Sequence, residues 1–282
     1  MLRWKLKKSA RYAVAGASWI AGLAPDSSHA GLSRRVRVLT YHRFGNAERD
    51  PFCVSPFAFE AQMAFLSRHG LALSLSDLEQ FLAGAPGIRH NSVLVTIDDG
   101  HLSTWSIARP ILKRHHIPAV AFVTPGMVGR KRGFDERISE SYAGWSELRE
   151  LTASGVQVAS HSMSHRSLGA MSSAQVREEA AMSKTMLEDR LGVEVGAFAY
   201  PYGTRADFTT ATGQILRDVG YRFAFTSQHG PISRGVNHWE LPRIKIEGGE
   251  PLWMFRLATR GGLDQWKWID RSLWRLQASP GR

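Results

Sequence analysis

Acidic and histidine side chains directly follow two apolar runs of the sequence. Asp98 and Asp99 come after the run SVLVTI, and His161 and His165 come after VQVAS. Two adjacent carboxylates at the end of a buried strand repel each other and are costly to desolvate, so a bound metal or a proton-transfer role would justify them. Two histidines four residues apart lie on one face of a helical turn and can chelate a divalent metal.

A single metal site can unite these groups. Asp99, His161 and His165 would provide three protein ligands and leave a position for water, which is typical of a catalytic metal. Imidazole and carboxylate suit one divalent ion, with zinc expected first and cobalt, nickel or iron as alternatives. Taken alone, Asp99-Gly100 is also a common turn dipeptide, so the pairing with histidines carries the prediction.

Two other strand ends carry candidate groups. His42 follows the run VRVLTY and could act as a general acid or base, because its unperturbed pKa lies near neutrality. By itself it could equally be a histidine bonded to backbone. Tyr202 lies in FAYPYG, where Pro201 ends a strand and Gly203 permits a sharp turn. A backbone N–H on that turn could face an oxyanion.

Short β-branched runs alternate with amphipathic stretches along the body of the chain, which predicts a parallel α/β sheet with helices outside, either a barrel or an open doubly wound sheet. The four clusters fall at strand C-termini, the rim where barrels build active sites. A short helix is expected with a capping box of Ser76 and Glu79, and residues 126–144 are expected to form a polar loop. The predicted strands are Val36–Tyr41, Ser92–Ile97, Ala119–Thr124, Val156–Ser160, Ala197–Tyr200, Arg222–Thr226 and Leu241–Ile246.

The 282-residue chain has a formal net charge of +11, and the excess sits at its two ends. Residues 1–11 hold five Lys/Arg and no acid, and residues 252–282 hold six against two acids. The nearly neutral body argues against a nucleic-acid-binding domain, and the basic ends favour association with a membrane surface. One cysteine, Cys53, excludes a disulfide scaffold.

We expect three regions. Residues 1–30 combine a basic start, a mildly apolar run and the small residues Ser28-His29-Ala30, which predicts a signal peptide or a membrane-proximal basic segment. Residues 31–250 form the catalytic domain, and residues 251–282 form a basic, Trp-rich helical extension. Export to the periplasm or cell envelope is expected, with a cytoplasmic or membrane-associated location as the alternative.

Together the motifs resemble the polysaccharide deacetylase family, also called the NodB-homology or carbohydrate esterase family 4 fold. TIDDG at residues 96–100, HSMSH at 161–165 and YPYG at 200–203 stand in the family's order, and the resemblance covers roughly residues 35–250. It implies a distorted (β/α)₇ barrel and a metal-dependent hydrolase that removes acetyl groups from the N-acetylated sugars of a polysaccharide.

The resemblance also implies roles by motif position. Asp98 would be the general base for a metal-activated water. Asp99, His161 and His165 would be the metal ligands, and the backbone N–H of Tyr202 would stabilise the oxyanion.

Two departures from the family pattern point to a subgroup. The family's usual Arg is replaced by Ala199, and the usual L-x-H motif is absent from the second half of the chain. Both features are similar to the exopolysaccharide and poly-N-acetylglucosamine deacetylases, whose acid comes from an N-terminal Y-H strand end. His42 in VLTYHRF then becomes the general acid, and Arg243 in LPRI becomes the candidate for the missing Arg.

Rival functions stay open at this point. A glycan-binding or assembly protein with impaired catalysis could share the fold, and an esterase could remove O-acetyl groups instead.

Overall fold

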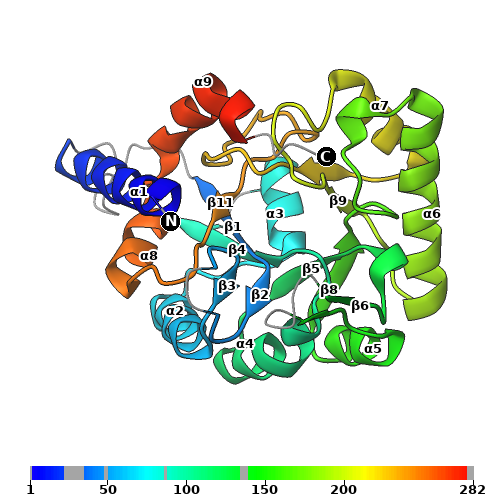
Figure 1. Ribbon diagram of the computed structural model, residues 1–282, viewed down its shortest axis with the longest axis horizontal. Helices are drawn as coiled ribbons and strands as arrows, with labels where there is room; N and C mark the ends of the chain where they lie inside the picture. Colours follow the sequence, from blue (N-terminus) through cyan, green and yellow to red (C-terminus); the bar gives the residue numbers. More distant parts are fainter. Residues whose placement is uncertain (1, 22–34, 48–49, 86–87, 134–138, 278–282) are drawn as a thin grey trace.

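The protein is built around one parallel sheet of seven strands in the spatial order β10-β9-β8-β5-β4-β1-β11. The structure is a computed structural model that describes residues 2–21, 35–47, 50–85, 88–133 and 139–277 (Figure 1). The strands of this sheet are β1 Val36–Tyr41, β4 Ser92–Ile97, β5 Ala119–Val123, β8 Val156–Ser160, β9 Ala197–Ala199, β10 Phe223–Phe225 and β11 Ile244–Lys245.

The sheet curls until its two edge regions are joined by one short stretch of chain. Leu241 forms a parallel bridge with Phe225 of β10, and three residues later Ile244 pairs with Leu39 of β1. Arg243 therefore lies in the short stretch of chain that joins β10, at one edge of the sheet, to β1, near the other edge. This curled parallel sheet with outer helices confirms the distorted (β/α)₇ barrel that the sequence predicted.

Every residue of β1, β4 and β5 is buried, as expected for strands covered on both faces. Side chains that point outward pack under the surrounding helices. Those that point inward, such as Val38, Leu94 and Phe122, form a separate core inside the barrel. Helix α3 (Leu75–Leu82) contributes Leu78 and Phe81 to that inner core, and Figure 1 shows it lying against the strands inside the ring of outer helices.

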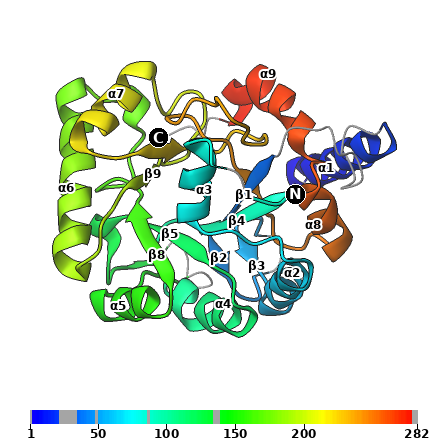
Figure 2. The same cartoon turned by 180° about the vertical axis from the view of Figure 1, so that it is seen from behind.

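The remaining helices divide into two groups. Helices of the first group surround the sheet: α2 Pro56–His69, α4 Arg109–His115, α5 Trp145–Ala153, α6 Ser173–Leu191 and α7 Thr210–Val219. Those of the second group, from the two ends of the chain, lie together at one side of the molecule (Figures 1 and 2): α1 Leu2–Ile20, α8 Leu252–Thr259 and α9 Lys267–Gln277.

Two local predictions were wrong. The capping box of α3 is formed by Ser74 and Asp77, not by Ser76 and Glu79, so the helix begins two residues earlier than expected. The stretch expected as a loop contains the antiparallel strands β6 (Lys131–Gly133) and β7 (Ser139–Ser141).

The remaining short elements connect the larger ones. They are β2 Arg43–Phe44, β3 Cys53–Val54, the π-helical turn Thr104–Ala108 and the 3₁₀ turns Pro125–Met127, Leu168–Ala170 and Asp264–Trp266.

Candidate metal centre

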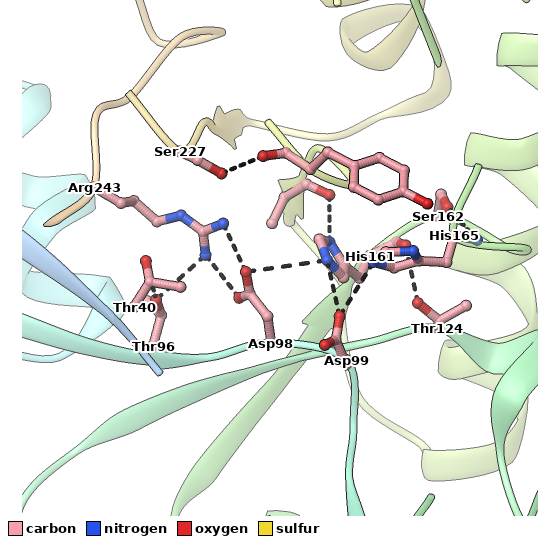
Figure 3. A network of polar contacts seen from close by, with 12 residues as sticks. Thr40, Thr96, Asp98, Asp99, Thr124, His161, Ser162, His165, Ser227 and Arg243 are labelled. Atoms are coloured by element: carbon pink, nitrogen blue, oxygen red, sulfur yellow. Dashed lines mark hydrogen bonds and ion pairs between the residues drawn. The ribbon is translucent and has the colours of Figure 1, made fainter. Parts of the chain in front are cut away.

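The C-terminal ends of β4 and β8 bring the predicted acidic and histidine residues together (Figure 3). One Asp99 oxygen, Oδ1, lies 3.4 Å from His161 Nε2 and 3.2 Å from His165 Nε2. One ligand atom from each of the three residues lies within 4.8 Å of the other two. Two imidazole nitrogens and a carboxylate oxygen thus converge on one point, as the sequence predicted.

The His161 ring is held in the orientation that a metal ligand needs. Its Nδ1 lies 2.8 Å from the carbonyl oxygen of Ala199, which can only accept, so Nδ1 carries the proton. Nε2 is then left with its lone pair directed toward Asp99. Fixing the tautomer through the distal ring nitrogen is the usual way in which proteins orient a ligating histidine.

The turn that carries His165 is tied to a helix. Glu179 on α6 accepts hydrogen bonds from the backbone N–H groups of Met163 and Ser164, each at 2.9 Å, and from the Ser164 hydroxyl. Sequence analysis missed Glu179, because it stands fifteen residues beyond Ser164 on a helix with no visible link to the motif. Only the docking of α6 beside β8 brings it to the turn.

The backbone around the site is locally strained. Asp99, Ser162, His165 and Tyr202 have φ angles between 60° and 75°, a region that non-glycine residues rarely occupy. They are four of the six non-glycine residues with positive φ in the described part of the chain. Such strain persists only where surrounding structure enforces it, and it clusters at functional sites.

Asp98 is held by a buried bidentate ion pair with Arg243. The two N–O distances are both 2.7 Å, and neither side chain is more than 3% exposed. Arg243 also donates to the Thr96 hydroxyl (Figure 3). A third bond runs to the Thr226 carbonyl, so the guanidinium is held by three residues. The structure thus places Arg243, the arginine predicted from LPRI, in direct contact with Asp98, the predicted general base.

Both carboxylates stay ionised although both are desolvated. Desolvation would raise the pKa of Asp98, but Arg243, His161 and His42 hold that pKa below its ordinary value. Desolvation would also raise the pKa of Asp99. There, contacts from His101 and the two candidate ligand histidines hold the pKa well below the ordinary value.

His42 lies close enough to both carboxylates to interact with their charges, and its ring packs edge-on against Phe52 with the centroids 4.9 Å apart. Burial lowers the pKa of His42 to about 4, and the attraction of Asp99 and Asp98 only partly counters that effect. The pKa of His42 therefore lies well below the near-neutral unperturbed value, because the ring is desolvated. In this state His42 is a neutral imidazole at neutral pH.

Tyr202 lies on the tight turn after β9. Its carbonyl accepts a hydrogen bond from the Ser227 hydroxyl, and its ring packs edge-on against His165 with centroids 5.0 Å apart. The next residue, Gly203, has φ of +63°, and a Cβ there would lie 2.5 Å from the Ser227 backbone nitrogen. Only glycine fits this approach, so the YPYG sequence fixes Tyr202 beside the candidate metal ligands.

Two residues that sequence analysis did not single out also contact the site. His101 Nε2 lies 3.3 Å from the second Asp99 oxygen, and its ring stacks on Tyr142. Lys245 places its ammonium 3.2 Å from the centroid of the Phe52 ring, which in turn packs against His42. His101 stands two residues after Asp99, so its closeness in sequence was the one available signal.

The donor set fits a divalent metal. Asp99 Oδ1 is buried and has no hydrogen-bond partner within the described residues, although two histidine nitrogens lie near it. A buried anionic oxygen without a donor is costly, and a cation at the convergence point would satisfy it. Two imidazoles and one carboxylate are ligands that zinc and its neighbouring transition metals accept.

Comparisons with known proteins agree with this geometry. Residues 87–224 match a family model described as polysaccharide deacetylase. The poly-beta-1,6-N-acetyl-D-glucosamine N-deacetylase of Staphylococcus aureus (strain MRSA252) is 26% identical over 207 residues, which cover 69% of this chain and 68% of the relative.

Solved structures share the fold. IcaB from Ammonifex degensii superposes with a TM-score of 0.67 at 29% identity, covering 81% of this chain and 97% of that protein. The Streptococcus pyogenes deacetylase PplD superposes with a TM-score of 0.70 at 22% identity, covering 81% and 99%.

Proposed function

The chain belongs to the polysaccharide deacetylase family, and on this premise we propose that it removes acetyl groups from the N-acetylated sugars of a polysaccharide. The observation that carries the proposal is that two adjacent carboxylates at the end of β4 have different partners. Asp99 faces two histidines, and Asp98 is locked by Arg243. The similarity to an N-deacetylase of poly-N-acetylglucosamine makes that polymer the first substrate to test.

In the proposed reaction, water adds to the acetamide carbonyl carbon, the C–N bond breaks, and acetate and a free sugar amine leave. A divalent metal held by Asp99, His161 and His165, with zinc expected first, would polarise the carbonyl and increase the acidity of water. Asp98 accepts the proton of the attacking water. Because Arg243 keeps the Asp98 carboxylate ionised and fixed in orientation, it acts as a positioning residue for this base.

The other two candidates act on the tetrahedral intermediate: one would stabilise its oxyanion, and the other would supply the proton that the leaving sugar amine needs. The backbone N–H of Tyr202 would donate to the oxyanion of the tetrahedral intermediate. His42 is neutral at rest, so it must take up a proton before it can protonate the sugar amine. Negative charge that develops on the oxyanion raises the pKa of His42 at the stage where the proton is needed.

The geometry favours catalysis over binding alone. A protein that only binds glycan has no need for a buried carboxylate held ionised by a bidentate arginine, which is an arrangement suited to proton transfer. Cleavage of O-acetyl esters would use the same groups, so substrate tests must separate the two reactions. Export of the chain stays a prediction.

The deciding experiment measures acetate release by the zinc-loaded full chain from N-acetylated and O-acetylated glycans. Asp98→Asn is the test variant. Asp189→Asn makes the same chemical change at an exposed position on α6 and serves as the matched control. Metal content is measured for all three proteins.

We expect acetate release from N-acetylglucosamine polymers by the wild type and by Asp189→Asn, but not by Asp98→Asn, with equal metal content in all three. Release only from O-acetylated glycans would replace the proposal with an esterase. Binding of glycan without release of acetate would replace it with a binding protein.

A further inference from the structure

The N-terminal helix α1 is anchored to the body of the protein by a buried cation. Arg11 is fully buried, and its guanidinium donates to Glu250 at 2.8 Å and to the Lys245 carbonyl at 2.8 Å. Glu250 and Glu247 hold the pKa of Arg11 above its ordinary value despite desolvation. Lys7 adds a 2.7 Å ion pair with Glu247.

This network attaches α1 to the barrel edge that carries the candidate site. Lys245 belongs to β11, two residues beyond Arg243. If a peptidase removed residues 1–30, Glu247 and Glu250 would lose the arginine that compensates their burial, and an unpaired buried charge is strongly destabilising. The contacts therefore favour α1 as a permanent element of the folded protein.

The opposite face of α1 is apolar and open to solvent. Leu6, Ala10, Ala13, Ala17 and Ile20 are all exposed and follow one another at spacings of four and three residues, so they form one stripe along the helix. Leu6 is 60% exposed and Ile20 is 87% exposed. One face of α1 is therefore buried through ion pairs, and the apolar stripe on the opposite face is available to contact another surface.

Exposed tryptophans and basic side chains lie elsewhere on α1 and on the neighbouring α8. Trp19 near the end of α1 lies under Arg260, and Trp253 on the neighbouring α8 packs against α1 through Tyr12. Trp253 is 47% exposed. In Figures 1 and 2, α1, α8 and α9 lie together at one side of the molecule, away from α6.

Helix α9 adds the same combination of side chains. Trp268 is 56% exposed, and both Lys267 and Arg271 lie over its ring. Apolar residues and tryptophan mixed with lysine and arginine are characteristic of helices that lie in the interface of an anionic bilayer. None of the described helices is both long and apolar enough to cross a membrane.

We propose that α1, together with α8 and α9, docks the protein on the surface of an anionic phospholipid bilayer, with the stripe Leu6 to Ile20 inserted at the interface. Charge complementarity selects this partner, because the cations of these helices face anionic headgroups while the stripe enters the apolar boundary. This docking is independent of the proposed catalytic function.

Co-sedimentation of the full chain with vesicles tests the proposal. The vesicles contain phosphatidylcholine alone or phosphatidylcholine mixed with phosphatidylglycerol. The test variants are Leu6→Asp and Ile20→Asp. Met182→Asp, which makes the same kind of change at a 46% exposed position on α6, is the matched control.

We expect wild type and Met182→Asp to bind the mixed vesicles, with binding that weakens as salt is added. Each stripe variant should lower the partition coefficient about tenfold or more, because it removes one inserted apolar side chain and adds a charge that anionic lipid repels. Thermal unfolding and acetate release from a soluble glycan should be unchanged in both variants, since these positions point away from the body.

Three results would overturn the proposal. One is failure of the wild type to bind anionic vesicles. Another is equal loss of binding in Met182→Asp. The third is a wild-type dimer that Leu6→Asp dissociates without vesicle binding in either form, which would assign the stripe to a second copy of the chain.

Discussion

Removing the positive charge of Arg243 should leave the Asp98 carboxylate, the proposed base, without its ion-pair partner and should not disturb the candidate metal ligands. The pair is buried and bidentate, with two 2.7 Å contacts. Charges about 4 Å apart attract by about 4 kcal/mol at an effective dielectric constant of about 20. Breaking such a pair from one side costs about 3–5 kcal/mol, because the remaining charge stays buried. Arg243→Met and Asp98→Asn should each lower the free energy of unfolding by an amount of this order.

A double-mutant cycle separates the interaction from other effects of each change. Removing both charges leaves neither one unpaired, so the double variant should cost about 2–3 kcal/mol less than the sum of the single variants. The exposed pair of Arg177 and Asp218, with an N–O distance of 3.2 Å, gives a matched cycle. Its coupling energy should stay below about 1 kcal/mol, because the pair is screened by solvent.

Turnover and metal content complete this test. Arg243→Met should reduce kcat by about 100-fold or more, the range that a positioned general base contributes. Metal content should not change, because the guanidinium of Arg243 bonds to Asp98, Thr96 and Thr226 rather than to the three candidate metal ligands. If the costs of the single variants simply add, or if Arg243→Met retains wild-type kcat, the role given to this ion pair is wrong.

Four other predictions use separate measurements. Asp98→Asn should keep its metal but lose turnover, whereas Asp99→Asn should lose metal by elemental analysis; the reverse pattern would exchange their roles. Removing metal with a chelator should abolish acetate release, and added zinc should restore it; activity that survives verified metal removal would contradict a metal-dependent reaction. Because burial lowers the pKa of His42 to about 4, its neutral form contributes stability above its unfolded pKa of about 6.5, and this is lost as pH falls through the folded pKa. In urea titrations, wild type should thus lose up to about 3 kcal/mol more than His42→Gln over that range, and parallel curves would refute the pKa assignment. Arg11→Met should cost about 3–5 kcal/mol by breaking a buried pair, and a change below about 0.5 kcal/mol would show that α1 is not anchored.

Sequence patterns predicted the strands well, because the apolar run of a strand is a local feature, and they placed Asp99 and the two histidines directly after such runs. A continuous apolar run such as SVLVTI suits a strand covered on both faces, and its burial confirms this. Asp99 follows β4 and His161 follows β8, and β5 lies between these two strands. The carboxyl ends of parallel strands share one edge of the sheet, so both residues lie at that edge, where their side chains meet across β5. Their convergence follows from strand order rather than from any one motif.

Other features could not be predicted because they depend on contacts between distant parts of the chain. Glu179 supports the His165 turn only because α6 docks beside β8. The low pKa of His42 depends on desolvation, which has no signature in sequence. The buried partners of Arg11 stand about 240 residues away, so these ion pairs could not be predicted from the basic N-terminus.

The position of Arg243 concerns how the buried Asp98 carboxylate obtains its positively charged partner. A buried Asp98 carboxylate needs a cation within hydrogen-bond distance, but that requirement does not specify which strand supplies it. The family pattern expects arginine at the position of Ala199, on β9, where the carbonyl instead orients His161. Because the barrel closes through the stretch that contacts both β10 and β1, a side chain in this stretch reaches Asp98 from the other side of the same inner space. In this chain the arginine that pairs with Asp98 therefore comes from the stretch just before β11 rather than from β9, and it keeps the carboxylate ionised.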